Sequence, residues 1–469
     1  DPGQFLSNVY SMAISKLAKL SSPAEASEWT EWVTQQADTA AINGSHDDDP
    51  AQFLSNVYSM AISNLADSSS PADISEWTDR VYEAIRRYAS SDTHSRTRDE
   101  FLADCCAMAL AKVTPKLPAT ESAWHADILT RSLKATPSTA VARFYARYAS
   151  CLTQDDVDGR WLSWIITDCL NRTIHAEQPV TDDPEGLAAS VVANTLCVPA
   201  ANFDNGLAEH PELPDTVARL ATDRETFETV LDGVETRYDD GDVSELVLND
   251  PESTDMQAVG QRVLAWVRGR AFVHAVTDDA DTAAEEIHDA AVETAREASE
   301  PRVRLTQFYT VALVGLAAET DPENAGAHDD LLGEALRREA IESLQFCLVY
   351  FRGLSDADSF LPDFAPEPGT FEWLLHVVDD LLTRAETDAA GLPDDHEQTG
   401  EMIAGMLATM ADRAYPASGP TRKFHTLLNT VADHDTDAAV TAHAIECVPE
   451  LLDENANLLA KFDWEERFA

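Results

Sequence analysis

Three stretches spaced 48 residues apart decide the fold of this chain. They read QFLSNVYSMAISKL at 4–17, QFLSNVYSMAISNL at 52–65 and EFLADCCAMALAKV at 100–113. Residues 1–33 and 49–81 are identical at 25 of 33 positions, whereas the third copy retains mainly the apolar positions. A repeat of this period predicts an array in which each copy is one supersecondary unit.

The apolar positions of the first stretch have helical spacing. They form one stripe along a helix, and such a stripe must be buried against another element. In the first copy the stripe consists of Phe5, Val9, Met12, Ala13 and Leu17.

A second helix is predicted in each copy. In the first copy Ser22, Pro23 and Glu25 provide an N-cap, a proline in the first turn and a capping box. A single hairpin of two such helices cannot bury both of its apolar faces, so neighbouring hairpins must stack. The second helix of every copy carries a Trp with an apolar residue four positions later: Trp29 and Val33, Trp77 and Val81, and Trp124 and Ile128.

Apolar spacing of helical type continues beyond the third copy, and no convincing run of strict alternation indicates a strand. We therefore predict an all-α chain. Residues 198–257 are the part in which this spacing is least clear. The further helical segments are predicted at 142–152, 305–319, 331–351, 370–386, 399–414 and 424–434.

The repeat length lies at the upper edge of the HEAT and armadillo range. The architecture resembles a HEAT-like α-solenoid of stacked helical hairpins, and the resemblance implies a scaffold that holds a partner along an extended face. We expect N-terminal repeats over 1–178, a middle helical segment over 184–275 and C-terminal repeats over 280–469. The N-terminal units are expected near 1–48, 49–96, 97–140 and 141–178.

The chain is strongly acidic. It has 84 Asp and Glu against 33 Lys and Arg, a net charge of −51, yet 44% of its residues are hydrophobic, so it has enough apolar surface to fold. The composition resembles that of haloarchaeal proteins, whose cytoplasm is concentrated salt. Because no segment reaches the length of a membrane-spanning helix, we expect a cytoplasmic protein without membrane contact.

One segment departs from this acidic background. Residues 80–147 contain 11 basic and 7 acidic residues. Arginine can bind carboxylates or phosphates through two parallel hydrogen bonds, so the segment is a candidate docking surface; the alternative is internal bridges between repeats. The same two interpretations apply to Arg262, Arg268 and Arg270. The candidate partner-binding residues are Arg86, Arg87, Arg96, Arg98, Lys112, Lys116, Arg131, Lys134, Arg143 and Arg147.

The sequence contains no motif that predicts catalysis. The GxGxxG, phosphate-loop, HExxH and GxSxG patterns are all missing. Glu285 and His288 have the spacing of a di-iron ligand pair, but such a site needs a second pair. The seven Cys form no CxxC pattern, and Cys105 and Cys106 replace apolar residues of the first copy, which predicts core positions. We therefore predict no catalytic, metal or cofactor site.

Three acidic groupings remain, and each favours a solvated helix face. Asp329–Asp330 and Asp379–Asp380 are adjacent acids, similar to the Asp-rich motifs of helical prenyl-transfer enzymes, but neither completes a DDxxD pattern. Glu372 and His376 are four residues apart, as expected for a pair on the flank of a surface helix.

Three functions are compatible with these features. The stacked repeats and the lack of catalytic motifs favour a non-enzymatic scaffold or adaptor that binds a protein partner. The first alternative is a factor that binds RNA or the ribosome through 80–147; the second is a metal-dependent helical enzyme acting on a phosphate-bearing substrate. Near-identity of the first two copies also predicts self-association through the N-terminal end of the array.

The charge predicts that the fold depends on salt. The Debye length is about 30 Å at about 10 mM salt and about 3 Å at about 1 M, so only high salt screens the carboxylates from one another. We expect helix content, measured by circular dichroism, to fall when the salt concentration drops below about 0.5 M. A spectrum that stays unchanged after dialysis to about 10 mM salt would contradict the expectation.

Overall fold

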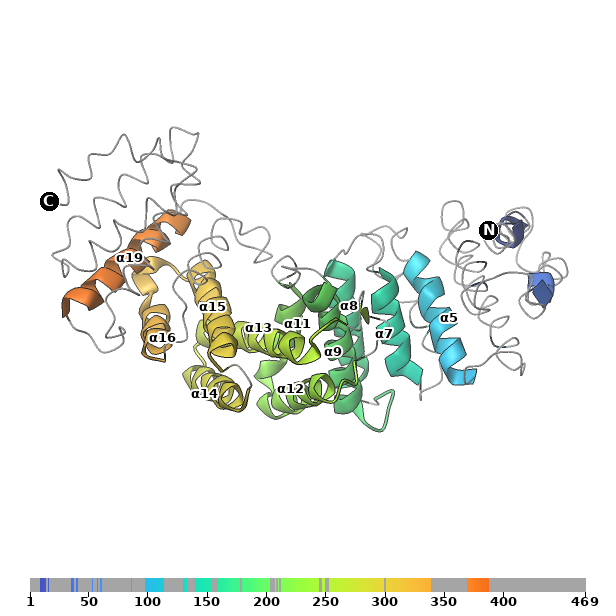
Figure 1. The fold of residues 1–469 in the computed structure, drawn as a ribbon, viewed down its shortest axis with the longest axis horizontal. Helices are drawn as coiled ribbons and strands as arrows, with labels where there is room; N and C mark the ends of the chain where they lie inside the picture. The colour runs from blue at the N-terminus through green and yellow to red at the C-terminus, as the bar shows by residue number, and fades with distance from the viewer. Residues whose placement is uncertain are drawn as a thin grey trace, which may run out of the picture. The chain divides into compact units, whose positions relative to one another are not determined.

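The computed structural model describes eight longer stretches of the chain and several short ones. All regular elements in these residues are helical and none is a strand, which confirms the predicted all-α class (Figure 1). Trp29, Trp77 and Trp124 lie outside the described residues. The longer stretches are 98–113, 140–152, 159–177, 179–202, 212–243, 253–298, 301–338 and 369–387; single positions and short stretches are described elsewhere.

The chain divides into two compact units. Unit 1 comprises Asp1–Asn202 and Asp232–Met256, and unit 2 comprises Phe203–Leu231 and Gln257–Ala469. The division runs through the middle segment that the sequence predicted at 184–275. That segment, like the other predicted boundaries, stays a prediction.

Unit 1 is built from helices that pack on their neighbours along the chain. Helix α7 contacts α5, α8 and α9, and α8 also contacts α9. Packing between helices that lie near one another in the chain is what stacked hairpins require. The helices are α5 (Arg98–Val113), α7 (Val141–Leu152), α8 (Gly159–Arg172) and α9 (Pro184–Asn202).

Equivalent positions of the repeat are buried in the second and third copies. Phe53 and Phe101 are fully buried, and so are Val57 and Cys105, which occupy one position of the stripe. At these two positions of the stripe the apolar pattern predicts burial correctly in both copies. Cys106 is buried as well, as expected for a core cysteine.

The first copy differs from the other two. Val9 and Met12 belong to the stripe that we expected to be buried, yet 46% and 51% of their surface is exposed. The prediction was wrong here because periodicity identifies the apolar face of a helix, while burial also requires a neighbour on that face. Self-association through this end of the array stays a prediction.

Helix α9 begins with local signals that the sequence carries. Asp183 accepts a hydrogen bond from the Gly186 amide at 3.0 Å, and Pro184 occupies the first helical position. Within the same unit, the Tyr238 hydroxyl donates to the carbonyl oxygen of Ala193 at 2.9 Å. This bond satisfies the hydroxyl of a tyrosine that is only 2% exposed.

Unit 2 contains the longest helix that the structure describes, α13 (Met256–Thr277). Most residues of α13 and of α15 are buried on every side of the helix, whereas α14 is amphipathic. Helix α12 contributes its first half to unit 2 and its second half to unit 1. The other elements are α11 (Glu212–Ala218), η3 (Arg219–Thr222), α12 (Arg224–Asp239), α14 (Asp281–Glu297), α15 (Pro301–Glu319), η5 (Pro322–Asn324), α16 (Gly326–Arg337) and α19 (Gly369–Thr387).

Two glycines allow α13 and α15 to approach closely. A Cβ atom added to Gly269 would lie 2.9 Å from Cβ of Val311 and 3.2 Å from the carbonyl oxygen of Phe308. One added to Gly315 would lie 2.6 Å from a methyl group of Val273. A larger residue at either position would force the helices apart, so both glycines serve packing.

The close approach predicts the effect of a single methyl group. Overpacking costs about 1 to 3 kcal/mol, and higher helix propensity offsets up to about 1 kcal/mol of it, so Gly269→Ala should lower the free energy of unfolding by about 1 kcal/mol or more. Urea unfolding at about 2 M salt, followed by circular dichroism, measures the change.

Gly326→Ala is the matched control. No atom lies within 4 Å of the position that its Cβ would take, so the free energy of unfolding should change by less than about 0.5 kcal/mol. Equal effects of the two substitutions would show that the α13–α15 contact is not as tight as described.

Candidate functional site

The structure describes part of the predicted basic surface. Arg98 is exposed at the start of α5, Arg86 is half-buried, and Lys112 is described only as part of the α5 backbone. Arg143 and Arg147 are half-buried on α7. The remaining candidates lie outside the described residues: Arg87, Arg96, Lys116, Arg131 and Lys134.

The two arginines of α7 bind the neighbouring helix. Arg143 donates through Nε to Oδ1 of Asp104 at 2.8 Å and through Nη2 to Oδ2 at 2.9 Å, and the Asp104 side chain is buried. Arg147 donates through Nη2 to the sulfur of Met108 at 3.3 Å. These contacts join α5 to α7, which is the internal bridging that the sequence left open. The surface role of the other candidates stays a prediction.

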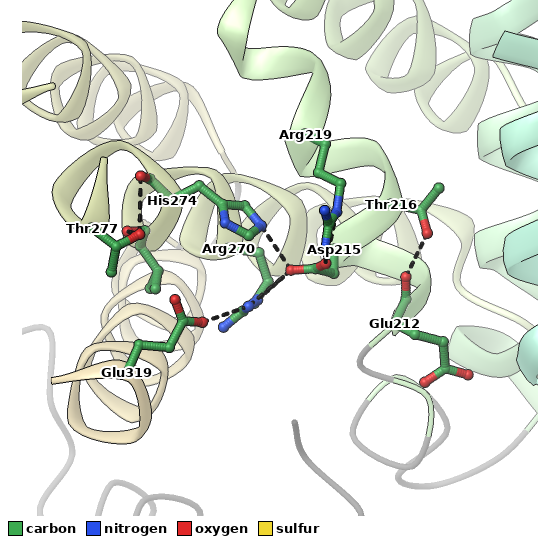
Figure 2. A network of polar contacts seen from close by, with 9 residues as sticks. Glu212, Asp215, Thr216, Arg219, Arg270, His274, Thr277 and Glu319 are labelled. Atoms are coloured by element: carbon green, nitrogen blue, oxygen red, sulfur yellow. Dashed lines mark hydrogen bonds and ion pairs between the residues drawn. The ribbon is translucent and has the colours of Figure 1, made fainter. Parts of the chain in front are cut away.

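A polar network of unit 2 centres on Asp215. This carboxylate lies on α11 and faces Arg270 and His274, which are one turn apart on α13 (Figure 2). Arg219 approaches it from η3, and Glu319 reaches Arg270 from the end of α15. Side chains of four helical elements therefore take part in one network.

Both oxygens of Asp215 are fully used. Oδ1 accepts from Nε and Nη2 of Arg270 at 3.1 and 2.8 Å, and it lies 2.8 Å from Nε2 of His274. Oδ2 accepts from Nε and Nη2 of Arg219 at 3.2 and 3.0 Å. The same Nη2 of Arg270 donates to Oε1 of Glu319 at 2.9 Å.

The network keeps a buried carboxylate charged. Burial by itself would raise the pKa of Asp215, but the hydrogen bond from His274 and the charge of Arg270 outweigh it. The pKa is therefore held well below its usual range. Arg270 is itself buried, so each charge compensates the other in a place that water barely reaches.

Among the residues that the structure describes, none is recorded as a nucleophile for an Asp–His pair. The Thr277 hydroxyl, which lies on the same helix as His274, donates to the backbone carbonyls of Val273 and His274 at 3.0 and 3.1 Å. The hydroxyl is therefore hydrogen-bonded within its own helix, and the structure records no contact between it and the His274 imidazole. The network joins α11, α13 and α15 and is best explained as a structural cross-link.

Arg268, one of the arginines that the sequence singled out with Arg270, is also internal. It is buried and donates to the Thr294 hydroxyl at 2.8 Å and to Oε2 of Glu228 at 3.1 Å. Arg268 therefore joins α13 to α12 and α14. For Arg268 and Arg270 the internal-bridge interpretation is the correct one.

The structure also describes the surroundings of two of the sequence motifs. The Nε2 of His288 lies 2.8 Å from the hydroxyl of Tyr309. Asp330 is exposed as expected, but Asp329 is half-buried beside two histidines, so the solvated-face interpretation was wrong for Asp329. His376, expected on the flank of a surface helix, is one of these two.

Neither a metal site nor a membrane span is found in the described residues. There, no group of three or more His, Cys, Asp or Glu side chains is arranged to hold a metal ion. Within the same part of the chain, no helix combines the length and the apolar character that crossing a bilayer requires.

Sequence reasoning missed Asp215. Its partner Arg270 lies 55 residues away, and no local pattern joins two positions so far apart. The only local signal was Arg219, four residues after Asp215, which is the spacing of an ion pair on a helix.

Comparison with known proteins shows no close relative. No protein-family model and no curated protein matches the chain. Among solved structures the chain is similar to a "Circular tandem repeat protein with novel repeat topology and enhanced subunit contact surfaces", with 14% identity, 98% of each chain covered and a TM-score of 0.28. At this TM-score the similarity carries no conclusion about function.

The network predicts that replacing Asp215 lowers the free energy of unfolding more than replacing Arg219 does. Asp215→Asn leaves the buried Arg270 with Glu319 as its one recorded charged partner, which should cost about 3 kcal/mol of unfolding free energy. Arg219→Gln should cost less than about 1 kcal/mol, because 72% of the Arg219 side chain is exposed.

Denaturant unfolding of both variants at about 2 M salt measures the difference. Because the folded-state pKa of Asp215 is depressed, its contribution is present above its unfolded-state pKa of about 4 and is lost as the pH falls below that value. Similar losses in the two variants at neutral pH would contradict a buried Asp215–Arg270 pair.

Proposed function

We propose that the protein is a non-enzymatic helical-repeat scaffold or adaptor that binds a protein partner in a high-salt cytoplasm. The observation that carries the proposal is the burial of equivalent apolar positions in successive copies of the repeat, at Phe53 and Phe101 and at Val57 and Cys105. Stacked repeats bury equivalent apolar residues against each other, and the stack offers an extended surface for binding.

The polar contacts of unit 2 support a structural role for its buried charges. Asp215, Arg268 and Arg270 all bind side chains of other helices in the same unit. A catalytic group has to face a reacting atom, and these groups face one another instead. The charged interior therefore favours a scaffold over an enzyme.

Protein is favoured over nucleic acid as the partner. Phosphate binding weakens steeply with salt because it is driven by counterion release, whereas apolar contacts persist in salt. Arg143 and Arg147 bind α5 and have correspondingly less to offer a phosphate backbone. Among the described candidates Arg98 is the exposed one.

Affinity capture of the full chain tests the proposal. Capture from a lysate at about 2 M salt should recover a protein in fixed stoichiometry with the chain, and recovery should survive nuclease treatment. Arg98→Glu should reduce that recovery severalfold if the basic segment is the docking surface.

Arg302→Glu is the matched control, since Arg302 is an exposed arginine in the first turn of α15, as Arg98 is in α5. Recovery that disappears with nuclease would favour an RNA-associated factor. Substrate turnover by the purified chain, with no stoichiometric partner, would favour an enzyme.

A further inference from the structure

The first copy of the repeat exposes part of its apolar stripe. Residues 9–13 are helical, and 46% of the surface of Val9 and 51% of that of Met12 are exposed. Lys16, one turn beyond Met12, is exposed as well, whereas Ser11 on the opposite side of the helix is fully buried. Val9, Met12 and Lys16 therefore lie on one outward face of the helix.

The same face is covered in the later copies. Val57 lies 48 residues after Val9 and is fully buried. At the methionine position the exposed surface falls from 51% in Met12 to an intermediate fraction in Met60 and to 3% in Met108. Two positions of the stripe therefore differ in burial between the first copy and the copies that follow it.

The residues of the stripe do not explain this difference, because all five of them are unchanged between the first two copies. The neighbours do explain it. Within the 469 residues the second copy is flanked by a copy on each side, whereas the first is flanked on one side. The residues that cover Val57 belong to this chain, so the open face around Val9 matches a surface that another repeat of the same kind presents.

The first copy also lacks the polar outer face of a capping repeat. Where the first two copies differ in sequence, the first is more apolar at two positions, with Leu20 in place of Ser68 and Trp32 in place of Arg80. Residues 2–24 contain no Asp or Glu, although the chain has a net charge of −51. Two chains that meet at this segment therefore bring no carboxylates of the segment together.

We propose that this face of the first copy binds the same face of a second copy of the chain, which gives a dimer with two-fold symmetry. Each chain supplies Val9 and Met12 to one apolar contact, with Lys16 at its edge. A patch that binds itself closes after two chains, because the same residues are used on both sides. Apolar contacts of this kind persist in high salt.

The dimer goes beyond the proposed function, in which the partner is a different protein. The purified chain alone tests the dimer, whereas capture from a lysate tests the other partner. Failure of one experiment therefore leaves the other proposal standing.

Light scattering after size-exclusion chromatography of the full chain at about 2 M salt tests the dimer. We expect the mass of two chains, with dissociation on dilution. Val9→Glu places a charge in the apolar contact and should raise the dissociation constant by about 10-fold or more. Helix content in circular dichroism should not change, because this position is exposed in the single chain.

Val303→Glu is the matched control. Val303 is an exposed valine, at 39%, in the first turn of α15, outside the first copy. This substitution adds the same charge to the chain and should leave the dissociation constant of the dimer unchanged. If Val9→Glu lowers helix content, Val9→Ser replaces it, since serine removes the apolar contact without adding a charge.

Four results would overturn the proposal. The first is the mass of one chain at every concentration. The second is an unchanged dissociation constant in a folded Val9 variant. The third is equal dissociation by Val303→Glu, because the effect would then belong to the added charge and not to this face. The fourth is a mass that keeps rising beyond two chains, which indicates a head-to-tail contact that does not close.

Discussion

An apolar stripe on a helix cannot be buried by the hairpin that carries it, and most of this structure follows from that constraint. Helix α5 packs on α7, and α7 packs on α8 and α9. Each helix buries its apolar face only when these neighbours are in place. Val9 and Met12 illustrate the same constraint, because they have the spacing of the stripe and are nevertheless exposed. The periodic spacing gives each helix an apolar face, and stacking against neighbouring helices is what buries that face.

Burying helices on all sides also brings charged groups into the interior. Unit 2 contains Asp215, Arg268 and Arg270 among apolar side chains, and each is compensated by a partner from another helix. In a chain with a net charge of −51, basic residues are far fewer than acidic ones, and these arginines join helices. Such pairs add little to net stability but penalise any packing that separates them, so they can specify which helices meet.

Periodicity predicted some helices well and others not at all. The segments 305–319 and 370–386 correspond to α15 and α19, whose observed bounds are Pro301–Glu319 and Gly369–Thr387. Helix α13 escaped recognition because it is buried on every side and therefore has no polar face to contrast with its apolar one. The ion pairs were equally hidden, since Asp215 and Arg270 are separated by 55 residues.

By itself the sequence determined the helical class, the repeated hairpin and the apolar positions of its stripe, because these depend on spacing within a few turns of chain. Only the tertiary structure decided which stripes are covered, which arginines turn inward and that Asp329 contacts His376 of a later helix. These outcomes depend on contacts between distant segments, and local spacing carries no information about which segments will meet.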